Sequence, residues 1–294
     1  MDWLEGEIIG FDKPYRWTSF DVVGKVRRLI CKQLAVKKLK VGHSGTLDPL
    51  ATGVLPIALG KATRLIPFVM EDTKTYEFTI KWGVETDTDD LGGTEVATSE
   101  KCPTKKEILN ILPKFRGQIT QTPSVYSAIK VGGKRAYELA RNGEKVDIPI
   151  RQISIHQLEL VKTTKTMADF VAKVSKGTYI RTLAHDLAHA LGTVGVVVRL
   201  HRVQDGPFEI KQACSLEEEL KILPMDCVLG NLPKLEVSPE IAQRIQYGQR
   251  IKDKNLLEKL PQNVATAIPA TNVAIAVLLS ETYTKIAEQI SNTR

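Results

Sequence analysis

Residues 42–55 constrain this chain more than any other stretch, because a single carboxylate stands there among small and apolar residues. The stretch reads GHSGTLDPLATGVL, and the carboxylate belongs to Asp48. Its glycines permit backbone conformations that other residues avoid, and Pro49 fixes φ directly after the carboxylate. The other polar side chains here include those of His43 and Thr46. The pattern predicts a loop that presents Asp48, although on composition alone an ordinary tight turn fits at least as well.

The bulk properties indicate a folded protein in a reducing compartment. With 294 residues, 43% of them hydrophobic, the chain can form one large domain and a small appendage. Its four cysteines are scattered without a Cys-x-x-Cys pair, which fits neither a disulfide framework nor a zinc knuckle. No secretory signal is evident, and no apolar stretch reaches the ~20 residues of a bilayer span. We therefore expect a cytoplasmic protein without a membrane segment.

Basic residues are concentrated directly before the Asp48 stretch. The net charge of +7 favours a polyanionic partner, and no acidic residue occurs between Asp21 and Asp48. Apolar residues recur at helical spacing from Val22 to Ile30, which predicts an amphipathic helix with a basic outer face. A solvated helix face is the alternative, but the position favours a phosphate-binding rim. The basic residues are Lys25, Arg27, Arg28, Lys32, Lys37, Lys38 and Lys40.

Hydrophobic periodicity predicts a mixture of strands and helices. Apolar and polar residues alternate over residues 75–82, as on a strand with one buried face. No regular βαβ repeat is evident, so a mixed α+β fold is expected rather than a doubly wound one. The other predicted strands are residues 8–12, 158–161 and 168–175, and the helices that follow the one from Asp21 are residues 105–112, 136–142, 182–191 and 215–220.

Several separated segments resemble the TruB family of tRNA pseudouridine synthases, which act on the T arm. The Asp48 stretch resembles the family's nucleophile motif, and the order and spacing of the other segments fit as well. The resemblance implies a pseudouridine synthase fold: α+β, with a mixed, largely antiparallel central sheet flanked by helices. The other matching segments are KP at Lys13, KTYE at 74–77, TDTDD at 86–90, QTPSVYSAIKVGGKRAYELAR from Gln121, SKGTYIRTLAHDLA at 175–188 and RLHRVQDGPF from Arg199.

The resemblance also implies a division of the chain into domains. Residues 1–232 would form the catalytic domain, in which residues 120–149 are an insertion that closes over the RNA. The composition changes after residue 232, and residues 233–294 resemble a short or divergent form of the small, β-rich, RNA-binding PUA domain. Basic residues that could follow a phosphate backbone within the insertion are Lys130, Lys134, Arg135 and Arg141.

Three residues receive catalytic roles from the resemblance. Asp48 would be the nucleophile that holds an intermediate while the freed uracil turns over. Arg181 would pair with Asp48 and favour its ionised form in an apolar pocket. Tyr76 would stack on the target base and is a candidate for proton transfer at C5, although a plain core aromatic is the alternative.

Four further residues are expected to contact the substrate. His43 matches a position that stacks against displaced bases, and Leu200 one that touches the substrate, although a turn histidine and a core leucine are the alternatives. Lys13 belongs to the matching KP segment. Tyr179 would share the face of Arg181 if both lay on a strand.

The expected reaction converts uridine 55 of the T arm to pseudouridine without a metal or an organic cofactor. The uridine must leave its stacked loop before Asp48 can reach it. Whether the carboxylate attacks C6 of the base or C1′ of the sugar stays open. The expected partner is the tRNA T-arm stem-loop, and the expected oligomeric state is a monomer. The rival hypotheses are a base-excising glycosylase and a non-catalytic RNA-binding or RNA-chaperone protein with the same fold.

One possible metal motif is judged incomplete from the sequence. The segment HDLAH places His185 and His189 four residues apart, on one face of a predicted helix. The zinc-protease pattern requires glutamate where Asp186 stands, and the sequence suggests no third ligand. No metal site is therefore expected.

Overall fold

The computed structural model describes residues 7–67, 73–216, 238–247, 274–277 and 286–289. The helices are α1 (Ser19–Gln33), α3 (Lys105–Ile111), α4 (Ala136–Arg141), α5 (Ile180–Ala190) and α6 (Pro239–Gln246), with short 3₁₀ helices η1 (Gly60–Leu65), η2 (Leu112–Phe115) and η3 (Ile210–Gln212). The strands are β1 (Glu7–Lys13), β2 (Val41–His43), β3 (Ala51–Leu59), β4 (Lys74–Trp82), β5 (Val84–Thr86), β6 (Glu95–Thr98), β7 (Gly117–Gln121), β8 (Lys130–Val131), β9 (Lys134–Arg135), β10 (Arg151–Thr163), β11 (Met167–Val174), β12 (Gly195–Asp205), β13 (Phe208–Glu209), β14 (Ala274–Val277) and β15 (Ile286–Gln289).

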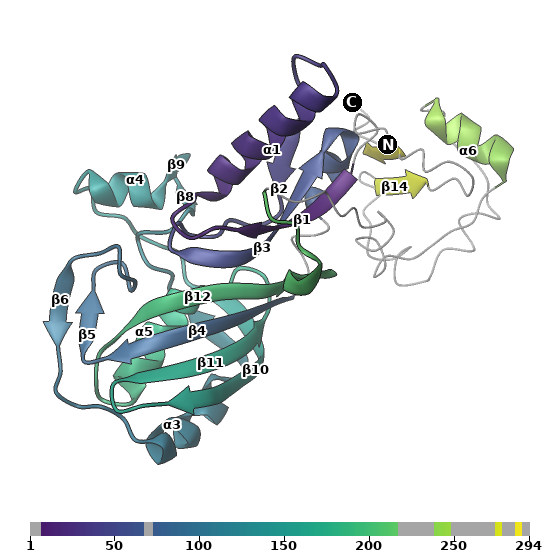
Figure 1. Ribbon diagram of the computed structural model, residues 1–294. Coiled ribbons are helices and arrows are strands. Elements are labelled where there is room, and N and C mark those ends of the chain that lie inside the picture. Colours follow the sequence, from purple (N-terminus) through teal and green to yellow (C-terminus); the bar gives the residue numbers. More distant parts are fainter. Residues whose placement is uncertain (1–6, 68–72, 217–237, 248–273, 278–285, 290–294) are drawn as a thin grey trace.

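A nine-stranded mixed sheet forms the centre of the molecule (Figure 1). Its strand order is β1-β3-β12-β4-β11-β10-β7, and β2 and β13 pair with β3 and β12 respectively. Its strand pairs are antiparallel except for β3 with β12, which run parallel. The predicted α+β class and the mixed, largely antiparallel sheet are therefore confirmed.

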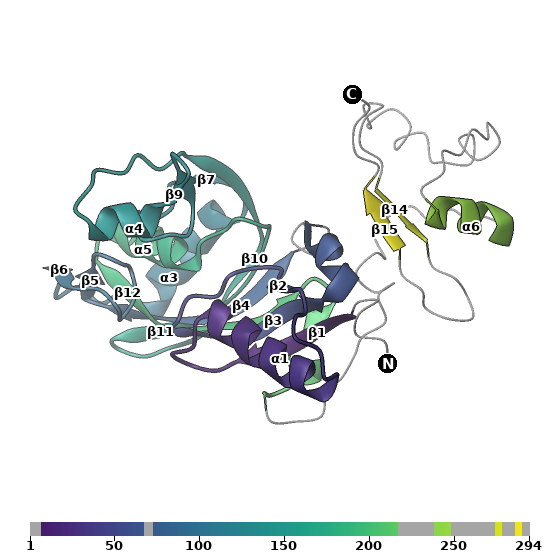
Figure 2. The same ribbon diagram turned by 90° about the horizontal axis from the view of Figure 1, so that it is seen from above.

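The helices cover different parts of this sheet. Helix α1 lies beside β1, β2 and β3, whereas α3 and α5 cover the part formed by β4, β10, β11 and β12 (Figures 1 and 2). Phe78, Phe170 and Trp82 belong to the main hydrophobic core. The rings of Phe78 and Phe170 stack with their centres 5.3 Å apart. Among the helices of the described segments, none combines the length and the apolar character needed to cross a bilayer.

Helix α1 follows the predicted amphipathic pattern. Thr18 and Asp21 form a reciprocal capping box at its N-terminus, which satisfies backbone donors that the first turn leaves free. The helix buries Val22, Val23, Val26 and Ile30, whereas Leu29, expected on the same face, is 41% exposed. The exposed basic residues of α1 and of the loop after it are Arg28, Lys32, Lys37, Lys38 and Lys40.

Strand β3 was not predicted, because residues 42–55 were interpreted as one loop. Every residue of β3 except Thr52 is buried, so the strand lacks the alternation that marks a half-buried strand. Gly53 lies where β3 meets β12, with φ at 105°, and a Cβ there would lie 2.2 Å from the carbonyl oxygen of Arg202. Only glycine allows this close approach. The loop that presents Asp48 is thus the short turn between β2 and β3.

The other predicted elements differ in how well they match. Helices α3, α4 and α5 and strands β1, β4 and β11 lie within about two residues of their predicted bounds, an ordinary error for element ends. The predicted strand 158–161 is part of the longer β10, and β12 was not predicted. The predicted helix 215–220 and the predicted domain 233–294 lie largely outside the described residues.

Candidate active site

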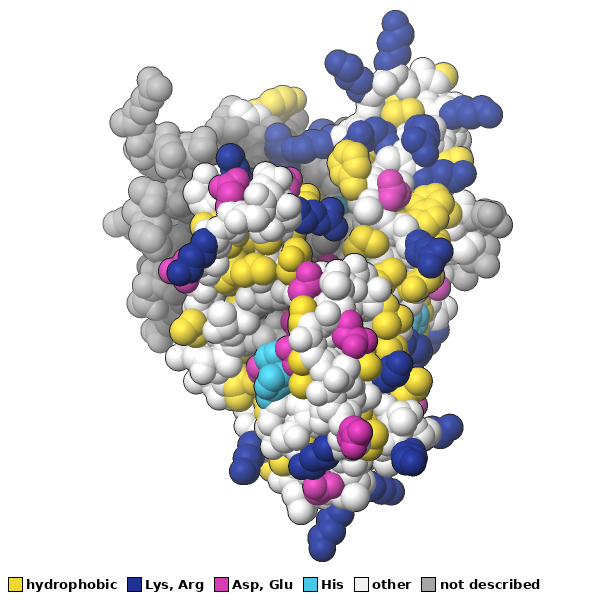
Figure 3. All heavy atoms as spheres, turned by 90° about the vertical axis from the view of Figure 1, so that its left-hand side faces the viewer, with side chains coloured by type: hydrophobic (Ala, Val, Ile, Leu, Met, Phe, Trp, Pro, Cys, Tyr) yellow, Lys and Arg dark blue, Asp and Glu magenta, His cyan; other side chains and the backbone are white. Residues whose placement is uncertain are grey.

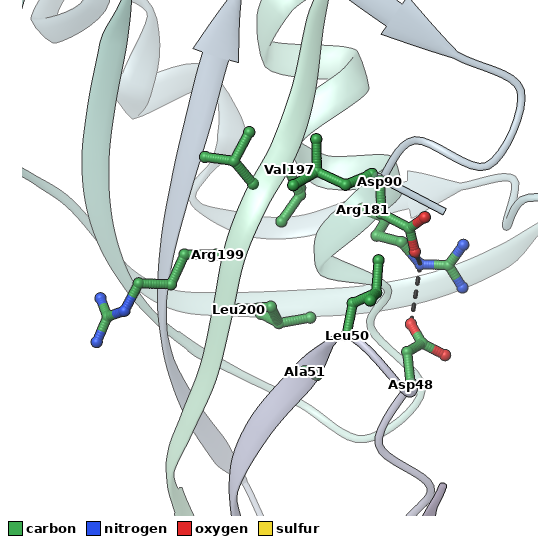
Figure 4. Close-up of a pocket in the computed structure, with 10 residues that line it drawn as sticks. Asp48, Leu50, Ala51, Asp90, Arg181, Val197, Arg199 and Leu200 are labelled. Carbon is green, nitrogen blue, oxygen red and sulfur yellow. Dashed lines mark ion pairs between the residues drawn. The ribbon is translucent and has the colours of Figure 1, made fainter. Parts of the chain in front are cut away.

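The turn before β3 brings Asp48 to the N-terminal end of α5, where Arg181 lies. Arg181 Nε is 2.9 Å from Asp48 Oδ2, as the dashed line in Figure 4 marks. The Arg181 side chain is only 6% exposed, whereas that of Asp48 is 37% exposed. The carboxylate is therefore open to solvent while the cation that neutralises it is buried.

Backbone carbonyls and a second carboxylate hold the Arg181 guanidinium in place. Its Nη1 donates to the Thr88 carbonyl at 2.7 Å, and its Nη2 donates to the Tyr126 carbonyl at 3.2 Å. Asp90 Oδ2 lies 3.7 Å from the Nε that pairs with Asp48. Because Nε, Nη1 and Nη2 of the planar guanidinium each have a partner, Arg181 has little freedom to move away from Asp48.

A small pocket opens beside this ion pair. Figure 4 shows Asp48, Asp90 and Arg181 on one side of it and side chains of β12 on the other. Arg199 points away from the ion pair and binds Glu77 instead, at 2.8 Å. The apolar part of the lining consists of Leu50, Ala51, Leu91, Val197, Val198 and Leu200. The apolar part of the lining offers a surface on which an aromatic ring can pack beside the paired carboxylate.

Lys13 binds the Asp48 turn through backbone carbonyls. The residue is fully buried, and its Nζ donates to the carbonyls of Trp17 at 2.6 Å, Pro14 at 3.1 Å and Pro49 at 3.4 Å. Burial lowers the pKa of Lys13 from 10.5 to about 8, with the Asp48 carboxylate acting in the opposite direction. These contacts indicate a structural role next to Asp48, and the predicted role in substrate binding gains no support from them.

Arg202 is a second buried cation at the site. It is 1% exposed, and its Nε and Nη2 donate to the carbonyls of Val54 and Gly45 at 2.8 and 3.1 Å. The same guanidinium approaches Asp205 at 3.4 Å, and Lys74 reaches the other oxygen of Asp205 at 3.0 Å. Arg202 thereby holds the chain on both sides of the Asp48 turn. The sequence analysis did not identify Arg202 as a site residue. The pattern that could have indicated it is an arginine and an aspartate three residues apart within RLHRVQDGPF.

Tyr76 lies on β4 directly opposite Arg202 of β12, and it is 7% exposed. Burial raises the pKa of Tyr76, Arg202 opposes this shift, and the carboxylates of Asp205 and Asp48 add to it. The side chain is therefore a neutral phenol near neutral pH. It can stack or donate a hydrogen bond, whereas a phenolate is disfavoured.

Tyr179 would share the face of Arg181 only if both residues lay on a strand, and this condition is not met. Tyr179 is the N-cap residue of α5, and Arg181 lies in the first turn. The Gln121 side chain holds Tyr179 in this position, because it accepts from the Tyr179 amide at 2.8 Å and donates to its carbonyl at 3.1 Å. Burial raises the pKa of Tyr179, and the nearby Asp48 charge adds to the shift, while Arg151, 5.6 Å from the ring centre, opposes it.

His43 and the basic insertion lie near one another. His43 ends β2, and its buried Nδ1 has no hydrogen-bond partner. Burial lowers the pKa of His43, followed by the charges of Arg202 and Arg135, so the imidazole is neutral near pH 7. Lys130, Lys134, Arg135 and Arg141 are all exposed, on the β8–β9 hairpin and at the end of α4. In the view of Figure 3, lysine and arginine side chains lie mainly over the upper and lower ends of the molecule.

One group of side chains in the described segments could hold a metal ion. It consists of Glu85 of β5 and of His185 and His189 of α5, whose ligand atoms all lie within 4.8 Å of one another. The fold therefore supplies the third ligand that the sequence did not suggest.

Comparison with known proteins places these features in a family context. Residues 32–180 match the model of the TruB family pseudouridylate synthases, N-terminal domain. A curated protein of Zymomonas mobilis, tRNA pseudouridine synthase B, is 42% identical over 93% of each chain. The protein of the same name from Novosphingobium aromaticivorans is 45% identical over 84% of this chain and 85% of its own.

Solved structures share the fold. A Cbf5-Nop10-Gar1 complex contains a chain that is 26% identical, with a TM-score of 0.64, covering 84% of this chain and 68% of that one. A chain of an H/ACA RNP bound to a substrate RNA containing 2′-deoxyuridine is 24% identical, with a TM-score of 0.63, covering 85% and 68%. The second likeness supports the fold alone.

Proposed function

This chain belongs to the TruB family of pseudouridylate synthases, and on that premise we propose that it converts uridine 55 in the T arm of tRNA to pseudouridine. One observation carries the proposal. Asp48 is a half-exposed carboxylate paired at 2.9 Å with the buried Arg181, beside a pocket with apolar walls. A protein that only bound RNA would not need a carboxylate at such a place, because carboxylates repel phosphate.

The reaction is an isomerisation, so no atom is gained or lost overall. The bond from N1 of uracil to C1′ breaks, the base turns, a bond from C5 to C1′ forms, and the proton on C5 moves to solvent while N1 takes one up. Asp48 acts as the nucleophile that holds the intermediate through the turn, and either C6 or C1′ as its target agrees with an open carboxylate. Arg181 keeps that carboxylate charged and oriented.

Tyr76 and the apolar residues orient the base. As a neutral phenol, Tyr76 stacks against uracil or donates a hydrogen bond, and removal of the C5 proton needs a base other than a resting phenolate. Leu200 and Val197 line the side of the pocket opposite the ion pair. The freed uracil must stay beside Asp48 until the second bond forms, and this retention distinguishes a synthase from a glycosylase.

Recognition of the RNA falls to the basic surface around the pocket. The target base leaves its stacked loop at a cost of a few kcal/mol, and His43 stacks in its place. Residues 120–149, with Lys130, Lys134, Arg135 and Arg141, close over the stem-loop, and the exposed lysines after α1 contact the phosphates. We further propose that residues 1–232 form the catalytic domain and that residues 233–294 form a short or divergent PUA-like domain.

The test is an analysis of products from a T-arm transcript that carries labelled uridine at position 55. Pseudouridine in the RNA without free uracil supports the proposal. Free uracil with an abasic site would assign a glycosylase, and unchanged RNA that is nevertheless bound would assign a binding protein. A transcript with cytidine at position 55 is the matched control, and it should give no pseudouridine.

A further inference from the structure

A cluster of two histidines and a glutamate lies on α5 beyond Arg181. His185 and His189 follow Arg181 at intervals of four residues, so all three occupy one face of the helix. The two imidazole rings stack with their centres 4.1 Å apart. Glu85 approaches both rings from β5, with its Oε2 2.7 Å from His189 Nε2 and its Oε1 3.7 Å from His185 Nε2.

These three side chains form a ligand set that suits a transition-metal ion. Two imidazole nitrogens and a carboxylate oxygen are the ligands of many three-residue zinc sites, in which water takes the fourth position. The ligand atoms already lie within 4.8 Å of one another, so small side-chain rotations would bring each to the ~2.0–2.2 Å of a zinc bond. Histidines four residues apart on a helix are a common chelating pair.

The surroundings of the cluster favour the same conclusion. The Nδ1 of His185 lies 3.3 Å from the Asp186 carboxylate, which leaves Nε2 directed at Glu85. A carboxylate on the far ring nitrogen is the usual support for a metal-binding histidine. The side chains of His189, His185 and Glu85 are 49%, 32% and 17% exposed, so an ion and a water molecule can reach them. Figure 3 shows histidine side chains at the surface beside acidic ones.

We propose that Glu85, His185 and His189 form a binding site for one divalent transition-metal ion, of which Zn²⁺ is the probe. The ion joins β5 to α5. The loop that follows β5 contains Thr88, whose carbonyl accepts from Arg181, and Asp90, which lies beside the same guanidinium. Metal binding therefore stabilises the loop that holds Arg181, which lies about one helical turn from His185 and about two from His189. The ion takes no part in the RNA chemistry.

The test measures metal binding by the full-length chain after treatment with a chelator and dialysis. Zn²⁺ is titrated in competition with a chromophoric chelator, and the native chain should bind one ion. Asp186→Asn should lower the affinity about 10–100-fold, and His185→Ala or His189→Ala should lower it further. Glu85→Gln distinguishes a metal site from a purely structural hydrogen bond between Glu85 and His189. The amide of the variant can still accept from His189, but it is a poor zinc ligand, so the variant should bind Zn²⁺ more weakly.

His156→Ala is the matched control, since His156 is an exposed histidine on β10 and should not affect binding. Circular dichroism checks that each variant is folded. Because the His189 side chain is exposed, His189→Ala is the variant expected to disturb folding least. Hydrogen exchange gives a second readout: Zn²⁺ should slow the amides of residues 84–90 in the native chain and not in His189→Ala. No binding by the native chain, or equal affinity in the native chain and the Glu85, His185 and His189 variants, overturns the proposal.

Discussion

The hydroxyl of Ser19 makes two hydrogen bonds to the backbone of Leu47, the residue before Asp48. It accepts from the Leu47 amide at 2.8 Å and donates to the Leu47 carbonyl at 3.0 Å. Both groups are buried, so helix α1 fixes the start of the turn that presents the carboxylate. The Asp48 turn is therefore positioned by α1, by Lys13 and by Arg202 together.

Ser19→Ala should lower the free energy of unfolding by about 1–3 kcal/mol, because it leaves buried polar groups of Leu47 without partners. It should also lower kcat, since Asp48 follows directly. Chemical denaturation and a pseudouridine assay measure the two effects. Ser99→Ala is the control, because Ser99 accepts a hydrogen bond in an exposed setting, and an equal loss in both variants would contradict the account.

Arg202→Met should lower the free energy of unfolding by about 3–5 kcal/mol, because it removes one partner from a buried ion pair. Arg199→Met is a matched control on the same strand. Arg199 is 53% exposed where it pairs with Glu77, and an exposed pair contributes about 0–1 kcal/mol. Denaturant unfolding of both variants gives the comparison, and a similar loss in the two would show that Arg202 does not hold the turn.

Lys13 gives the stability a defined pH dependence. Its pKa is about 8 in the folded chain against 10.5 for an ordinary lysine, so between these values the unfolded chain binds more protons at this residue. The free energy of unfolding should therefore rise with pH across that window. Lys13→Met removes the titration, so the native chain should gain stability relative to the variant as the pH rises. Denaturation at several pH values tests this, and parallel pH curves would refute it.

Arg181→Lys should lower kcat about 100-fold or more, because a lysine cannot maintain the contacts to Asp48, Thr88 and Tyr126 together, and misplacement by 1 Å can cost that much. Binding of the T-arm transcript should change little, since Arg181 is buried and faces a carboxylate. Single-turnover rates and a filter-binding assay separate the two quantities. Arg199→Lys, which alters an arginine that points away from the ion pair, should keep the native rate.

Strong local patterns made many of the described helices and strands predictable. Alternation over β4 and helical spacing in α1 persist because each element buries one face. Strand β3 was not predicted because it is buried on both faces, so its sequence does not alternate between apolar and polar residues. The condition that Tyr179 and Arg181 share a strand fails because helix α5 begins between them, and the Gln121 side chain binds the backbone of Tyr179 there.

Contacts between distant residues could not be predicted from local pattern. Arg202 holds carbonyls that are 148 and 157 residues away in the sequence, and Glu85 meets His189 across 104 residues. Such contacts follow from the order of the strands, which the periodicity of single segments does not determine. The ion pair of Asp48 with Arg181 was expected only because the motifs resemble a known family.

The proposed reaction depends most directly on the Asp48 carboxylate, and one measurement tests this dependence. Tritium release from C5-labelled uridine is followed in a T-arm transcript under single-turnover conditions, with the native chain and with Asp48→Asn at saturating RNA. The native chain should release tritium, and Asp48→Asn should bind the transcript but release none above background. Equal release from the two proteins would contradict the assignment of Asp48 as the nucleophile.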